Sequence, residues 1–195
     1  MFAEEFRKNV KGSFTVSEAA KCGVSRSQLA GWTMSGIVER VARGIYRFPD
    51  DVYNAQPEIE ILVKRGTQFR VALQSALRLH DFTTALPSSV WVALPRGGRV
   101  PKVDFPLEVV FLSGSSWEHG FQTVNVQGLA VPTFSPAKTV ADLFKFRNKT
   151  GLDIAVESLK EGLRKKLFCV DELMAAAEAD RAVKIVTPYL EAIIG

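Results

Sequence analysis

Three groups of side chains in this 195-residue sequence could carry out chemistry, and the first is the pair His80–Asp81. An aspartate beside a histidine can orient the imidazole for work as a general base. The pair follows a segment with helical periodicity, however, and the helix dipole favours histidine at a C-terminus. No nucleophile motif accompanies it. The sequence therefore favours a helix cap followed by a turn, and we predict no catalytic residue.

The second group consists of the carboxylates Asp142, Asp153 and Glu157, a side-chain type that binds metal in nucleases. Their spacing places them on solvated helix faces or at helix starts, where they would not converge on one ion. We therefore expect no metal site and no cofactor.

The third group is the basic, glycine-rich segment from Arg96 to Lys102, RGGRVPK. It lacks the Lys-Ser/Thr ending of a phosphate-binding P-loop. Two interpretations stay open: a basic hairpin loop without a partner, or a contact for nucleic acid or an acidic partner.

DNA binding is the chemistry that the N-terminal residues favour, because they are patterned as two capped helices. Thr15 and Glu18 have the Thr-x-x-Glu spacing of a capping box, and Gly23 can end the helix that starts there. Ser25 and Gln28 repeat the box and start a second helix. A short helix, a glycine turn and a second capped helix are typical of a DNA-binding helix-turn-helix.

A β hairpin is predicted after the second helix. Residues 37–41 alternate apolar and polar side chains, Arg43-Gly44 forms a tight turn, and residues 45–48 return. The hairpin would be the wing of a winged helix-turn-helix.

The second helix is predicted to bury Leu29. Helical geometry then places Ser27, Gly31 and Met34 on the outer side, with Ala30 on its shoulder. Glycine costs about 1 kcal/mol at an exposed helical position. A close approach to a DNA groove would explain so small a residue at position 31. Otherwise Gly31 is simply tolerated there or packs against a neighbouring element.

Positive charge is concentrated in the same segment. Residues 1–48 contain eight lysines and arginines against four acids, so they carry the whole net charge of +4 and the remaining residues balance. Such an excess is typical of a phosphate-binding module. The predicted DNA-binding residues are Arg26, Ser27 and Gln28 for base edges, Arg43 for phosphate or the minor groove, Lys21, Arg40 and Arg47 for phosphate neutralisation, and Ser25 beside them.

In the second half of the chain the sequence predicts strands first and helices after them. The predicted strands are 90–94, 107–112, 121–126 and 129–134. The fold class is therefore α+β: a winged helix-turn-helix over 1–50, then a mixed α/β domain over 51–195 with a small sheet and several helices. The predicted helices at 57–79 bridge the two, and whether they brace the first domain stays open.

Composition places the protein in a reducing compartment. The two cysteines, Cys22 and Cys169, lie far apart and have no metal-ligand spacing. The N-terminus has no signal-peptide pattern, and no apolar run approaches the roughly 20 residues that cross a bilayer. We expect a cytoplasmic protein that does not bind a membrane.

Two sets of motifs, one in each half, carry a resemblance to a known family. The N-terminal set is the phenylalanine-threonine start at Phe14, Gly23-Val24-Ser25, Gln28-Leu29, Gly36-Ile37-Val38 and Arg43-Gly44-Ile45-Tyr46. The second set is Leu79-His80-Asp81-Phe82, Val90-Trp91-Val92, Pro95-Arg96-Gly97 and Ser135-Pro136-Ala137-Lys138-Thr139 running into Val140-Ala141-Asp142-Leu143-Phe144. In this combination the chain resembles the AbiEi-type antitoxins of type IV toxin–antitoxin systems.

The resemblance implies a bacterial, non-enzymatic transcriptional regulator. Its winged domain would bind inverted repeats in promoter DNA and repress its own operon. Its C-terminal domain would counter a nucleotidyltransferase-like toxin, and a type IV antitoxin need not form a stable complex with that toxin. Two alternatives stay open: a nuclease or nucleotide-modifying enzyme that uses the winged domain for targeting, and a winged module that binds protein.

Overall fold

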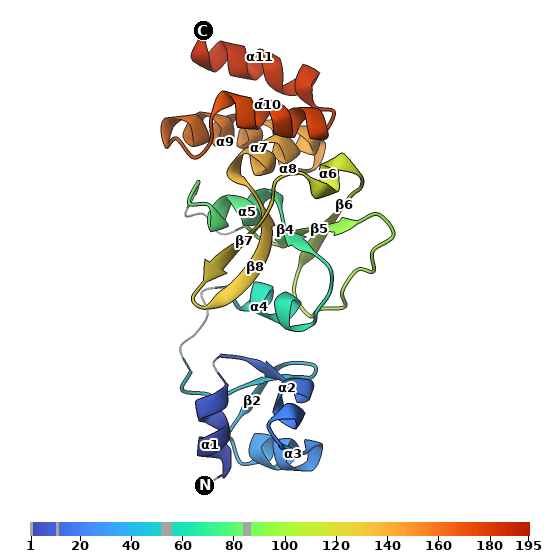
Figure 1. The fold of residues 1–195 in the computed structure, drawn as a ribbon, viewed down its shortest axis with the longest axis vertical. Coiled ribbons are helices and arrows are strands. Elements are labelled where there is room, and N and C mark those ends of the chain that lie inside the picture. Colours follow the sequence, from blue (N-terminus) through green and yellow to red (C-terminus); the bar gives the residue numbers. More distant parts are fainter. Residues whose placement is uncertain (1, 11, 52–55, 84–86) are drawn as a thin grey trace. The chain divides into compact units, whose positions relative to one another are not determined.

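The computed structural model describes the chain except residues 1, 11, 52–55 and 84–86 (Figure 1). Helices and two small sheets make up the described residues, which confirms the predicted α+β class. Two compact units divide the chain, Met1–Thr67 and Gln68–Gly195. Of the described helices, none is both long enough and apolar enough to cross a membrane.

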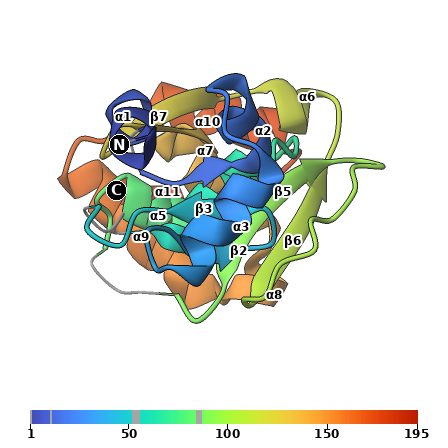
Figure 2. The same ribbon diagram turned by 90° about the horizontal axis from the view of Figure 1, so that it is seen from below.

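The N-terminal unit contains helices around a three-stranded antiparallel sheet of order β1-β3-β2. Its elements are α1 (Phe2–Asn9), β1 (Phe14–Thr15), α2 (Val16–Lys21), α3 (Arg26–Met34), β2 (Glu39–Ala42), β3 (Ile45–Arg47) and α4 (Pro57–Lys64). Figures 1 and 2 show α3, in blue, next to β2. Two helices followed by a hairpin appear in the order that the sequence predicts.

Local capping sets where α2 starts. The hydroxyl of Thr15 accepts the Glu18 N–H at 3.1 Å, and the Glu18 carboxylate accepts the Thr15 N–H at 2.7 Å. Gly23, just past the helix, has a left-handed backbone with φ 81°. The predicted capping box and glycine stop are both confirmed.

Aromatic rings fill the core of the N-terminal unit. Phe6 and Phe14 pack edge to face with centroids 4.9 Å apart, and Phe48 packs against both. Leu29 of α3 is buried in this core, as predicted. The core therefore fixes which side of α3 faces outward.

Helix α4 belongs to the N-terminal unit because a buried carboxylate ties it there. Glu60 accepts hydrogen bonds from the N–H and the hydroxyl of Ser13, at 2.9 and 2.5 Å, and Lys64 pairs with Glu18 at 2.8 Å. The boundary between the two compact units consequently follows Thr67, later in the chain than the predicted boundary at residue 50. The residues expected as helices at 57–79 are split between the two units.

The C-terminal unit has a mixed five-stranded sheet of order β6-β5-β4-β8-β7. Its strands are β4 (Arg70–Val71), β5 (Val90–Pro95), β6 (Leu107–Leu112), β7 (Phe121–Val126) and β8 (Leu129–Phe134). Pairing is parallel for β5–β6 and β4–β8, and antiparallel for β4–β5 and β7–β8. The four predicted strands are confirmed, whereas the short β4 lies where the sequence predicts the start of a helix.

The helices of this unit share the core of the sheet. They are α5 (Leu73–Leu79), α6 (Ser115–Glu118), α7 (Pro136–Lys145), α8 (Arg147–Thr150), α9 (Leu152–Arg164), α10 (Val170–Ala179) and α11 (Val183–Ile194). In the sequence, α5 and α6 lie between the strands of the sheet, and the others follow its last strand. Figure 1 shows α7, α9, α10 and α11 gathered on one side of this unit, in orange to red. Ser135 caps α7 by accepting the Lys138 N–H, with Pro136 in the first turn.

Candidate nucleic-acid interface

Helix α3 begins with a capping box that engages one of the predicted base-reading residues. The Ser25 N–H donates to the Gln28 carboxamide oxygen at 2.8 Å, and the Gln28 N–H donates to the Ser25 hydroxyl at 3.2 Å. The Ser27 hydroxyl lies 3.0 Å from that of Ser25. The structure thus gathers Ser25, Ser27 and Gln28 in one exposed turn. For Gln28 to bind adenine through both ends of its carboxamide, the cap must first open.

The outer side of α3 carries small and apolar side chains. Ala30 and Gly31 are exposed, and the side chain of Met34 is 91% exposed. A Cβ added at Gly31 would meet no atom of the described chain within 4 Å. Within the described part of the N-terminal unit, packing against a neighbouring element therefore does not explain Gly31, and a tolerated glycine or a close approach to DNA stays open.

The hairpin displays two of its three arginines. Arg43 lies exposed in the turn beside Gly44, whose φ is 78°. Arg40 is also exposed, and its Nε donates to the Ala42 carbonyl at 3.4 Å. These are positions from which a guanidinium can reach phosphate.

Arg47 does not occupy such a position, which corrects the prediction that it neutralises phosphate. Its side chain is buried, and its guanidinium pairs with the Glu39 carboxylate on the neighbouring strand. Arg47 and Glu39 are directly opposite in the β2–β3 register. The arginine therefore stabilises the hairpin from inside.

Two further predicted residues complete the exposed set. Lys21 lies in the last turn of α2 and Arg26 in the first turn of α3, and both are exposed. With Arg40 and Arg43 they are four exposed cations in the N-terminal unit. In chemical terms the exposed residues of α2, α3 and the hairpin offer positive charge and hydroxyl groups, and the outer side of α3 is small and apolar.

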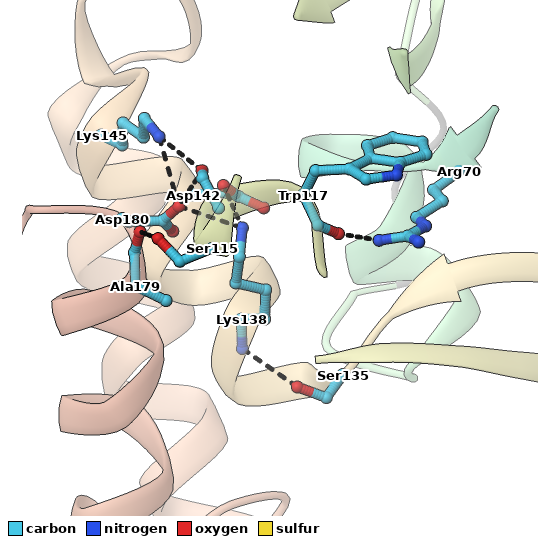
Figure 3. A network of polar contacts seen from close by, with 10 residues as sticks. Arg70, Ser115, Trp117, Ser135, Lys138, Asp142, Lys145, Ala179 and Asp180 are labelled. Carbon is cyan, nitrogen blue, oxygen red and sulfur yellow. Dashed lines mark hydrogen bonds and ion pairs between the residues drawn. The ribbon is translucent and has the colours of Figure 1, made fainter. Parts of the chain in front are cut away.

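A second polar feature, in the C-terminal unit, was not predicted. Lys138 of α7 pairs with Asp142 at 2.6 Å and with Asp180, the residue that ends α10, at 3.2 Å (Figure 3). Lys145 lies 3.3 Å from the same Asp180 oxygen, and Ser116 of α6 donates to that oxygen at 2.5 Å. We call these five residues the buried ionic cluster.

Burial corrects the expectation that Asp142 lies on a solvated helix face or at a helix start. Its exposure is 1%, and that of Lys138 is 0%. The sequence carries no signal for this burial, because Val140, Leu143 and Phe144 lie on one side of α7 while Lys138 and Asp142 lie on the other, as in a helix with one solvated face. Lys138 and Asp142 are four residues apart on α7, so they can pair with each other inside the protein.

Burial raises the pKa of Asp142 to about 7, and the nearby Asp180 adds to the rise while Lys138 opposes it. One oxygen of each carboxylate, Oδ2, is buried without a hydrogen-bond partner in the described chain. Among the described residues, no group of three or more His, Cys, Asp or Glu side chains could hold a metal ion. The cluster joins α6, α7 and α10, and substrate cannot reach its buried carboxylates.

The raised pKa of Asp142 predicts a pH-dependent stability. Between the ordinary value of 3.8 and about 7 the folded chain keeps a proton that the unfolded chain releases. The free energy of unfolding should therefore fall as pH rises through this window. Asp142→Asn cannot ionise, so its stability should vary less between pH 5 and 7.5 than that of the natural chain. Urea unfolding at several pH values measures this, and parallel pH profiles would contradict it.

His80 and Asp81 have the structural role that the sequence favours. His80 caps α5, is 9% exposed, and its Nε2–H donates to the Phe134 carbonyl at 2.6 Å. Burial lowers the pKa of this imidazole. Asp81 follows with φ 56°, which is the backbone of a turn.

Arg70 occupies another buried cationic position. Its guanidinium lies 3.8 Å from the ring centroid of Trp117 and 4.3 Å from that of Phe121, and it donates to the Trp117 carbonyl (Figure 3). Burial lowers its pKa. Through these cation–π contacts Arg70 of β4 stabilises the packing of α6, which contains Trp117, and of β7, which contains Phe121.

The basic segment from Arg96 to Lys102 joins β5 to β6. These strands are parallel, so the hairpin interpretation of this loop is wrong. Arg96, Arg99 and Lys102 are exposed. Their role as a contact for nucleic acid or an acidic partner stays a prediction.

Comparison with known proteins relates part of the chain to a family. No curated protein matches the chain. The matching family model is described as "Transcriptional regulator, AbiEi antitoxin" and covers residues 1–49, the part of the chain that runs from α1 through the hairpin β2–β3. Residues 1–49 thus match the AbiEi antitoxin family of transcriptional regulators, as the resemblance of the sequence implies.

Proposed function

We propose that this chain is a DNA-binding antitoxin of a type IV toxin–antitoxin system. The N-terminal unit acts as a winged helix-turn-helix, binds inverted repeats in its own promoter and represses the operon. The C-terminal unit counters a nucleotidyltransferase-like toxin, without requiring a stable complex with it. The chain acts in the cytoplasm and is not an enzyme.

The observation that carries this proposal is the match of residues 1–49 to the antitoxin regulators, in the segment that displays α3 and the hairpin. The side chains on that segment suit its proposed target. Arg26 at the start of α3 and Arg43 in the hairpin turn are exposed, and exposed cations supply most of the affinity of a protein for DNA. In this arrangement α3 enters the major groove and the hairpin contacts the flanking backbone.

The C-terminal unit supports a separate activity through its own construction. It has its own five-stranded sheet and its own core, which includes Phe134, Val140 and Leu159. The antitoxin role of this unit rests on the motifs around Ser135-Pro136 that resemble the family. An independent core lets one unit change without unfolding the other.

The test combines a promoter reporter with a toxin-rescue assay, using the full chain. The natural chain should lower expression from the promoter of its own gene and should restore growth when the neighbouring toxin gene is induced. Arg40→Ala with Arg43→Ala should lose repression and keep rescue. Loss of rescue in that variant, at unchanged protein level, would show that neutralisation needs DNA binding and would contradict the division of labour. A chain that neither represses nor rescues would contradict the whole proposal.

A further inference from the structure

The outer side of α3 has a composition that the fold itself does not explain. Gly31 has no left-handed backbone, and a Cβ there would meet nothing within 4 Å in the described chain. Alanine would fit and is the better helix former. Met34, one turn further, is 91% exposed, the highest value among the large hydrophobic side chains of the described residues. A partner outside the chain would account for both.

The charge around this face indicates a polyanionic partner. Residues 19–38 contain no aspartate or glutamate. Lys21 and Arg26 lie exposed at the N-terminal side of α3. Helix α3 itself has no acid that would repel phosphate, whereas the chain as a whole carries 21 acids. DNA therefore suits this face better than another protein does.

We propose that α3 reads DNA through the C5-methyl groups of thymine. The inference rests on the proposed function and names the chemistry of its recognition surface. Gly31 lets the helix backbone approach the base edges, and Ala30 and Met34 contact thymine methyl groups in the major groove. Apolar side chains distinguish thymine from the other bases through this methyl group.

The spacing of the two contacts fits base pairs that are two steps apart. Ala30 and Met34 are four residues apart and lie on the same side of the helix. They are separated by about 6 Å along the helix axis, roughly two base-pair steps. Gly31 lies between them. The preferred sites are therefore expected to contain thymines two base-pair steps apart, opposite the C-terminal half of α3.

The experiment begins with selection of duplexes by the full chain from random double-stranded DNA. Each thymine of the selected duplex is then replaced by deoxyuridine, which removes only the methyl group. The natural chain should lose about fourfold in affinity at each contacted position, the value of one buried methyl group. Met34→Ala should bind the thymine duplex more weakly by a similar factor. It should show no further loss when the thymine that Met34 contacts is replaced by deoxyuridine. Leu152→Ala, a truncation of an exposed leucine in the C-terminal unit, is the control and should behave like the natural chain.

Gly31→Ala gives a second and opposite pair of readouts. Its melting temperature should rise, because alanine favours the helix and nothing in the described chain obstructs its methyl group. Its affinity for the selected duplex should fall about tenfold or more, because the added methyl group holds the helix away from the bases. A more stable variant that binds less well cannot be explained by damage to the fold.

The outcomes separate this inference from the function on which it rests. If the natural chain binds no duplex even at 50 mM salt, the proposed function fails and the inference fails with it. If it binds, but Met34→Ala keeps the full penalty for uracil, the inference alone is overturned. Unchanged DNA binding in both variants, together with altered self-association in gel filtration, would assign this face to protein contact and would also overturn it.

Discussion

Replacing Asp180 by alanine should destabilise the C-terminal unit by about 3–5 kcal/mol, because it removes one partner of a buried ion pair. Asp180 is 4% exposed and lies within 3.3 Å of the amino groups of both Lys138 and Lys145. Without it, Lys138 keeps only Asp142 as a carboxylate partner, and Lys145 loses its buried carboxylate. Denaturant unfolding followed by the fluorescence of Trp91 and Trp117 would measure the loss.

Glu178→Ala is the matched control for this substitution. Glu178 lies in the last turn of α10, two residues before Asp180, but it is exposed. Its replacement should change the free energy of unfolding by less than about 0.5 kcal/mol. Equal losses in the two variants would mean that the buried ionic cluster contributes no more than an exposed acid does.

The second large effect is expected for DNA binding when Arg40 and Arg43 are both replaced by alanine. Each phosphate contact contributes about 0.9 to the slope of log affinity against log salt. At 0.15 M salt that corresponds to about fivefold in affinity per contact, so the double variant should bind roughly 25-fold more weakly. Its salt slope should also fall by about two, as measured by fluorescence anisotropy over a range of salt concentrations.

Arg47→Ala provides the contrast, because the structure places Arg47 inside the hairpin with Glu39. This variant should lower the melting temperature of the N-terminal unit and leave the salt slope of the folded protein unchanged. If its slope fell as in an Arg43→Ala variant, the guanidinium would have to leave Glu39 when DNA binds. If the Arg40 and Arg43 pair had no effect, the hairpin would not contact DNA.

Features that depend on neighbours in sequence could be predicted from the sequence. The boxes at Thr15–Glu18 and Ser25–Gln28 each close within three residues, and both form as expected. The turn at Gln127-Gly128 is also local: both residues have positive φ, 52° and 87°, as a tight hairpin requires. Local hydrogen bonding and backbone preference were sufficient in these cases.

Features that depend on distant contacts could not be predicted in this way. Ser13 and Glu60 are 47 residues apart, and their hydrogen bonds decide which unit holds α4. The parallel pairing of β5 with β6 is likewise invisible in the composition of the loop between them. Asp142 illustrates the same point in the buried ionic cluster. A carboxylate on a helix is usually solvated, and Asp180, which pairs with the same Lys138, lies far along the chain.

Among the predicted DNA-binding residues too, local features could be predicted and those that depend on distant contacts could not. Helical periodicity correctly gave the inward side of α3 at Leu29 and the outward side at Met34. Alternation along a short hairpin did not reveal that Arg47 is buried, because its partner Glu39 and the core beside it come from the tertiary fold. Charge counting alone treated Arg47 and Arg43 as equivalent.

The two carboxylate oxygens of Glu18 bind two different elements of the N-terminal unit. Oε2 accepts the Thr15 N–H that starts α2, and Oε1 pairs with Lys64 of α4. Burial works against the charged form, but Lys64 and the Thr15 hydrogen bonds outweigh it and lower the pKa of Glu18 below its usual 4.5. The stability that it contributes is therefore complete above pH 4.5 and is lost as pH falls through the lowered value. A single proton thus releases both attachments at once, so in acid the start of α2 and the anchorage of α4 should loosen as one event.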